Sequence, residues 1–121
     1  MAERTPPTPK GTGANGRRLW QSIVSAYELD EHETALLREA VRTIDRLDEL
    51  HAVVDAEGLM VEGRYGPKVH PAMVEARQLK IALARLLAAL RLPDGENGDE
   101  SQGRRQRRVG ARGVYGLRVA R

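Results

Sequence analysis

The side chains in this chain that are best suited to chemistry are cationic, and they gather near its two ends. A guanidinium group presents paired N–H donors to phosphate oxygens and needs no rigid scaffold to do so. We therefore expect these clusters to bind nucleic-acid phosphates, which gives affinity rather than sequence choice. The candidate DNA-binding residues are Lys10, Arg17, Arg18, Arg104, Arg105, Arg107 and Arg108.

The charge of the chain is unevenly distributed. Residues 101–121 carry seven arginines and no acid, whereas residues 1–100 hold 13 basic and 17 acidic residues. This split is typical of a basic arm for an anionic partner. The tail also offers apolar anchors for folding on a protein partner, and composition leaves both interpretations open. Those anchors are Val114, Tyr115, Leu117 and Val119.

Three further arginines, Arg38, Arg42 and Arg46, are spaced four apart and fall on one side of an expected helix. In a ring they would line a positive channel. Alternatively, Arg42 pairs with Asp45 and Arg46 with Glu49, three residues away. Residues 28–62 contain three basic and eleven acidic residues, which favours solvated ion pairs.

Few features indicate catalysis or a bound metal. There is no cysteine, and the histidines at positions 32, 51 and 70 are scattered. Residues 11–16 spell GxGxxG, but the prolines before them leave no strand to complete a dinucleotide fold. We predict a loop leading into a helix N-terminus, which could accept a DNA phosphate. We expect no catalytic residues, metal or cofactor.

The first half of the chain predicts an arm and two helices. Residues 1–15 are rich in Pro, Gly and Thr and predict a disordered or extended arm. Apolar residues at helical spacing predict a short helix over 16–27. A second helix is expected from Asp30 to about residue 56, because Asp30 and Glu33 form a capping-box pattern.

The second half predicts a hairpin, a helix and a tail. Residues 59–69 alternate in polarity around a turn at 64–67, which indicates a small β-hairpin or loop. Pro71 suits the first turn of a third helix ending near residue 91. Residues 94–121 lack apolar periodicity and predict a disordered tail, acidic and then basic. The fold class is therefore mainly α: a helical hairpin with a short N-terminal helix, forming one oligomerisation domain over 16–93.

The third helix is unusually apolar, since 11 of the 14 residues in 79–92 are Leu, Ile or Ala. One stripe can pack on the second helix: Leu79, Leu83, Leu86 and Leu90. Ile81, Ala84, Ala88 and Leu92 fall largely outside that stripe. A two-helix hairpin cannot bury such a helix on all sides, so we expect a homo-oligomer. The candidate oligomerisation residues are Leu79, Ile81, Leu83, Leu86, Leu87 and Leu90.

The sequence lacks the apolar stretch of a signal peptide and any run of about 18 uncharged apolar residues. We therefore expect a protein of the host cytoplasm without a membrane partner.

Residues 9–93 resemble the small subunit of phage terminases, which package DNA in tailed bacteriophages. The resemblance rests on the order and spacing of five stretches. They are Pro9-Lys10-Gly11 leading to Gly16-Arg17-Arg18-Leu19-Trp20; Tyr27-Glu28-Leu29-Asp30 with His32-Glu33 and Leu36-Leu37; Gly58-Leu59 with Val61 and Gly66; His70-Pro71 with Glu75-Ala76-Arg77; and Leu90-Arg91-Leu92-Pro93. The basic tail lies outside it.

The resemblance implies a non-enzymatic adaptor. Members of this family are largely helical and assemble into rings. They recognise double-stranded viral DNA at the packaging start, and they recruit and regulate the large subunit, which holds the ATPase motor and nuclease. The alternative from the residues alone is a small helical regulator or scaffold that binds proteins and no DNA.

Overall fold

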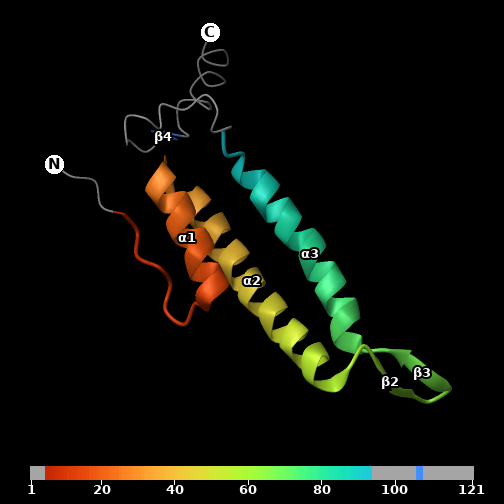
Figure 1. Ribbon diagram of the computed structural model, residues 1–121. Helices are drawn as coiled ribbons and strands as arrows, with labels where there is room; N and C mark the ends of the chain where they lie inside the picture. The colour runs from red at the N-terminus through yellow and green to blue at the C-terminus, as the bar shows by residue number, and fades with distance from the viewer. Residues whose placement is uncertain (1–4, 94–105, 108–121) are drawn as a thin grey trace, which may run out of the picture.

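The computed structural model describes residues 5–93 and 106–107 and is mainly helical, as the sequence predicts (Figure 1). Helices α2 and α3 run antiparallel as a long hairpin, and α1 lies beside the first half of α2. A small β-hairpin joins α2 to α3 and projects from one end. The main elements are α1 (Ala14–Ala26), α2 (Glu31–Glu57), β2 (Met60–Gly63), β3 (Gly66–Val69) and α3 (Pro71–Leu90).

Helix α2 begins and ends where its sequence predicts. Asp30 and Glu33 form the capping box, in which the Asp30 N–H donates to Glu33 Oε1 at 2.7 Å. Gly58 ends the helix with a φ of 95°, which a residue with a Cβ rarely adopts, and its N–H donates to Val54 O. Buried Leu37, Val41 and Leu47 mark the face that packs on the other helices.

The segment between α2 and α3 is a β-hairpin, one of the two forms that the sequence predicted for it. Strands β2 and β3 pair antiparallel, with Met60 opposite Val69 and Gly63 opposite Gly66. The turn is shorter than predicted: only residues 64 and 65 lie in it, and Gly66 and Pro67 belong to β3. Pro67 has no N–H to give, and an edge strand tolerates this.

His70 is the N-cap of helix α3. His70 Nδ1 accepts a hydrogen bond from the Ala72 N–H at 2.9 Å, and Pro71 occupies the first helical position. Because Nδ1 is an acceptor, Nε2 carries the ring proton and donates to Glu57 Oε1 at 2.7 Å. The two bonds fasten the start of α3 to the end of α2. At the other end Arg91 adopts the left-handed conformation and stops the helix.

Helix α1 begins two residues before the predicted start, and part of the predicted arm is held in place. Residues 5–13 have no regular secondary structure apart from a turn at 10–11, but the Trp20 Nε1–H donates to Pro6 O at 3.1 Å. At the far end of α1, the Tyr27 hydroxyl donates to Pro93 O at 3.0 Å. Composition predicted a disordered or extended arm over 1–15. It could not reveal these contacts, because they join residues far apart in the sequence.

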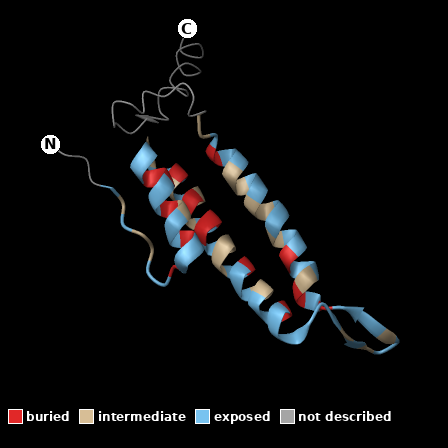
Figure 2. Ribbon diagram, in the orientation of Figure 1, coloured by how far each residue is buried: buried red, intermediate tan, exposed pale blue. Residues whose placement is uncertain are grey.

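The hydrophobic core lies at one end of the molecule, where side chains of α1, of the first half of α2 and of the end of α3 meet (Figure 2). Its buried members are Trp20, Ile23, Val24, Leu37, Val41 and Leu90. Leu92 packs against this cluster, although the helical wheel placed it outside the packing stripe. The wheel fails there because α3 has already ended at Leu90.

Strand β1 (Tyr27–Glu28) follows α1 and pairs in parallel with β4 (Gln106–Arg107). The rest of the predicted tail, 94–105 and 108–121, lies outside the described residues. In the described part of the chain, the helices are too short or too polar to cross a membrane.

Candidate nucleic-acid interface

The glycine-rich segment 11–16 leads into α1 and allows this helix to pack closely on α2. A Cβ on Gly16 would lie 2.8–2.9 Å from side-chain atoms of Thr12, Val41 and Asp45, so only glycine permits this approach. The Gly13 N–H donates to Asp45 Oδ1 at 3.1 Å. The carboxylate of Asp45 thus accepts the N–H of the N-cap residue of α1, a bond that the N3 side chain makes in a capping box. A phosphate at this helix N-terminus, which the sequence allows, would lie close to the Asp45 carboxylate.

A tight turn precedes this docking point. Thr12 Oγ1 donates to Pro9 O at 2.6 Å, which closes the turn, and Gly11 within it has a φ of 80°. The Arg17 guanidinium donates to Thr12 O at 3.0 Å. Asn15 adds a further link by donating to Asp48 at 3.0 Å. These bonds hold the turn against α2, and Lys10 lies at its corner.

The turn and α2 together enclose a groove of about 420 Å³, which we call the basic groove. Its cations are Lys10 from the turn and three arginines spaced one turn apart on α2, and the one carboxylate in its lining belongs to Asp45. None of the lining side chains is aromatic or an amide. The lining residues are Pro9, Lys10, Gly11, Thr12, Arg38, Arg42, Asp45 and Arg46.

The arginines of the groove differ in their partners. Arg46 pairs with Glu49 at 3.1 Å, as predicted, but Arg42 pairs with Glu39 at 2.7 Å and not with Asp45. The reason is that Asp45 is turned toward the start of α1. Both pairs are well exposed, so their contribution to stability is small. Within the described residues, neither Arg38 nor Lys10 has an ion-pair or hydrogen-bond partner.

The predicted DNA-binding residues divide into three groups. Lys10 lines the basic groove. Arg17 and Arg18 are exposed on the first turns of α1, and Arg17 also supports the turn. The side chains of Arg104, Arg105, Arg107 and Arg108 lie outside what the structure describes.

Sequence reasoning favoured solvated ion pairs for the arginine row of α2 and left open a positive channel inside a ring. It missed that residues 9–12 fold back over this row. The one local signal was the spacing of Gly13 and Gly16, which permits a close helix approach as well as a nucleotide loop.

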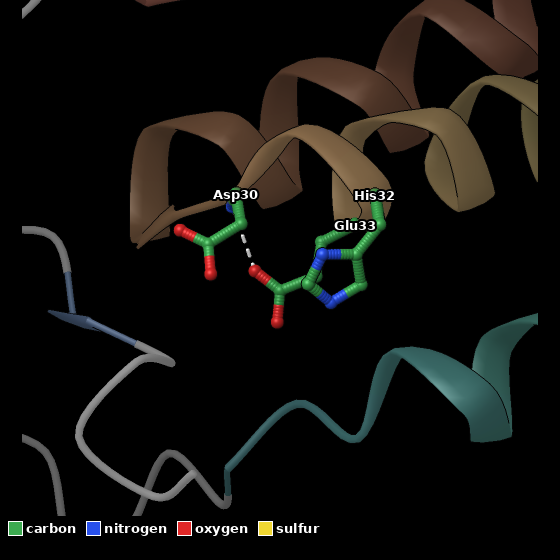
Figure 3. A group of neighbouring side chains, drawn as sticks. All are labelled: Asp30, His32 and Glu33. Carbon is green, nitrogen blue, oxygen red and sulfur yellow. Dashed lines mark hydrogen bonds between the residues drawn. The ribbon is translucent and has the colours of Figure 1, made fainter. Parts of the chain in front are cut away.

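A second cluster lies at the start of α2, where Asp30, His32 and Glu33 are neighbours (Figure 3). Their potential ligand atoms all lie within 4.8 Å of one another. The signal in the sequence was the close spacing of these three residues. It is easily missed, because the histidines of the chain are far apart from one another. Glu33 is 1% exposed and its carboxylate already accepts the Asp30 N–H, so the capping box explains the arrangement.

The predicted oligomerisation residues are only partly available to a second chain. Leu90 is fully buried within this chain and belongs to its core, so it cannot contact a partner. Ile81 is 45% exposed, and Leu87 packs against the core. The remaining three, Leu79, Leu83 and Leu86, are half-buried.

Many residues that carry the family resemblance lie at element boundaries. Gly16 allows α1 to dock, Asp30 and Glu33 cap α2, and His70 caps α3. These roles describe how a fold is built and not what it binds. Comparison with protein-family models, with curated proteins and with solved structures gives no match.

Proposed function

We propose that this chain is a small terminase subunit, a non-catalytic adaptor that binds double-stranded viral DNA in the host cytoplasm. In this role it assembles as a homo-oligomeric ring and recruits and regulates the large ATPase-nuclease subunit. The observation that carries the proposal is the basic groove, where four cations from two distant segments converge. The groove suits the phosphate backbone, and the surrounding fold is of the helical kind that the resemblance implies.

The ring supplies what a single groove lacks. One groove with a few phosphate contacts binds weakly, whereas several copies on one duplex act together through their effective concentration. The incompletely covered α3 provides surface for this assembly, because Val74 and Ile81 are 44% and 45% exposed. The basic tail adds further arginines to each copy.

The test is titration of a duplex with the purified full chain at several salt concentrations. We expect binding whose log–log salt slope is about −0.9 for each phosphate neutralised. A chain ending at Pro93 separates the tail from the body: binding by the body alone falls but persists. Salt-insensitive affinity, or no affinity for DNA, would contradict the proposal. The mass of the native assembly, with and without DNA, tests the ring.

A second candidate function, a protein-binding regulator without DNA binding, is favoured by a different surface. Leu59, Met60 and Val69 are all about half-exposed around the β-hairpin. Exposed apolar side chains of this kind suit a protein partner. The same titration decides, because a protein that binds only proteins leaves the duplex free at low salt.

A further inference from the structure

We propose that the basic groove between the 9–12 turn and α2 seats the backbone of one strand of duplex DNA. This inference rests on the proposed function and deepens it, since it assigns DNA contact to a folded part of the body rather than to the tail alone. It also assigns distinct roles to Arg38, Asp45 and the two acids that border the arginine row.

The spacing of the arginine row suits successive phosphates. Arg38, Arg42 and Arg46 are each four residues apart, which is about 6 Å along a helix axis. Phosphates of one strand are about 3.4 Å apart along the duplex axis and roughly twice that along the strand itself. The row can therefore follow neighbouring phosphates in order, with Lys10 facing it across the groove.

The composition of the lining favours phosphate over base. The lining offers cations and backbone, and it has neither an aromatic ring to stack on a base nor a side-chain amide to read adenine. The Thr12 hydroxyl already donates its hydrogen to Pro9 O, so it is not a free donor for a base. Contact here thus gives affinity that is independent of sequence.

The two ion pairs of the row lower its affinity for DNA, because their carboxylates compete with phosphate for the arginines. Arg42 and Arg46 already face Glu39 and Glu49, but these exposed pairs are weak and a phosphate can replace the carboxylate. Arg38 needs no such exchange, because it has no partner among the described residues. Arg38 is therefore the main contact, and Glu39 and Glu49 weaken binding.

Asp45 acts as a positioning residue. Its carboxylate accepts the Gly13 N–H and so holds the turn that carries Lys10 at the groove. It contributes negative charge to the lining but is engaged by α1 and not by the arginines. The groove therefore depends on Asp45 for its shape.

The experiment uses the full chain and charge changes that run in both directions. Arg38→Gln should lower affinity for a duplex roughly threefold to tenfold and reduce the salt slope by about 0.9, equally for unrelated sequences. Glu39→Gln should raise affinity by a similar factor. The matched controls are Arg85→Gln and Glu75→Gln, exposed charges on α3, which should change affinity less than twofold.

The outcomes separate this proposal from the function on which it rests. If the full chain binds DNA but Arg38→Gln and Arg85→Gln behave alike, the groove proposal falls and DNA binding stands. If the full chain binds no duplex, both fall. Binding of a hexaglutamate peptide in the groove, without any binding of DNA, would also overturn it. A circular dichroism melt confirms that each variant keeps its fold.

Discussion

The two ends of the helical hairpin are packed in different ways. At the three-helix end, α1 packs on the first half of α2, and side chains of both helices and of the end of α3 form one core in which Trp20, Leu37 and Leu90 are almost completely buried. At the two-helix end, α2 and α3 have only each other and the β-hairpin. Several large apolar side chains there are exposed, among them Val53 at 38%, Ile81 at 45% and Leu59 at 59%, although Val54 is buried.

The difference teaches that one short helix decides where apolar surface remains. Residues 79–92 are rich in leucine throughout, but α1 reaches only their C-terminal part, where Leu87 and Leu90 join the core. The uncovered surface lies instead on the first half of α3 and around the β-hairpin. Any second copy or partner protein should therefore contact the two-helix end, and DNA the basic groove beside α1.

The largest expected effect is the loss of the core at the three-helix end. Trp20 is 1% exposed and its Nε1–H donates to Pro6 O, so Trp20→Ala removes both packing and a hydrogen bond. We expect the free energy of unfolding to fall by about 3–5 kcal/mol. Met60→Ala at the two-helix end, where the side chain is 53% exposed, should cost less than about 0.5 kcal/mol. Urea unfolding at fixed protein concentration measures both, and equal losses would remove the distinction between the ends.

A smaller loss is expected where α1 docks on α2. Gly16→Val places methyl groups against Thr12, Val41 and Asp45, and we expect a cost of roughly 1–3 kcal/mol. The matched control is Ser22→Val, an exposed position of the same helix, where the change should stay within about 0.5 kcal/mol. If both variants are equally stable, the close contact at Gly16 does not hold α1 in place. Thermal melts of the two proteins decide this.

Local signals made most of the fold predictable. The Asp30 capping box, Gly58 and Pro71 each mark a helix boundary within a few residues, because their effects act through neighbouring backbone groups. The apolar residues Leu37, Val41 and Leu47 also recur at helical spacing, and all three are buried.

The basic groove was not predictable in the same way. It forms because Asp45, 32 residues away, accepts the Gly13 N–H and brings the turn over the arginine row. Nothing local distinguishes Asp45 from the other acids of α2, so the sequence suggested a pair with Arg42. Where α1 would stop covering α3 also depends on tertiary packing, and the six candidate oligomerisation residues could not be sorted by sequence alone.

A moderate and local effect is expected at the two-helix end. His70 caps α3 and donates to Glu57, so His70→Ala should cost about 1–2 kcal/mol. His70→Asn replaces the Nδ1 acceptor with an amide oxygen, so it should lose less stability than His70→Ala. Hydrogen exchange should show faster opening of β2, β3 and the first turn of α3, with the three-helix end unchanged. Equal acceleration at both ends would mean that the two ends unfold as one unit.

Changes at Val74 and Ile81 should have the smallest effect on the stability of a single chain. They also test whether the two-helix end is the surface through which the chains assemble. These residues lie seven apart, two turns along α3, and are 44% and 45% exposed. The double change Val74→Ser with Ile81→Ser removes little buried area, so the unfolding of a single chain should shift by less than about 1 kcal/mol.

Assembly should respond much more strongly, because the apolar surface that a second copy would cover is lost. We expect light scattering to show a smaller native mass for this double variant. The control, Glu75→Ser with Lys80→Ser, alters exposed polar positions of the same helix that lie away from the line joining Val74 and Ile81, and it should leave the mass unchanged. An unchanged mass in the double variant would mean that the chains associate through another surface. A monomeric parent protein would contradict both assembly through this surface and the proposed ring.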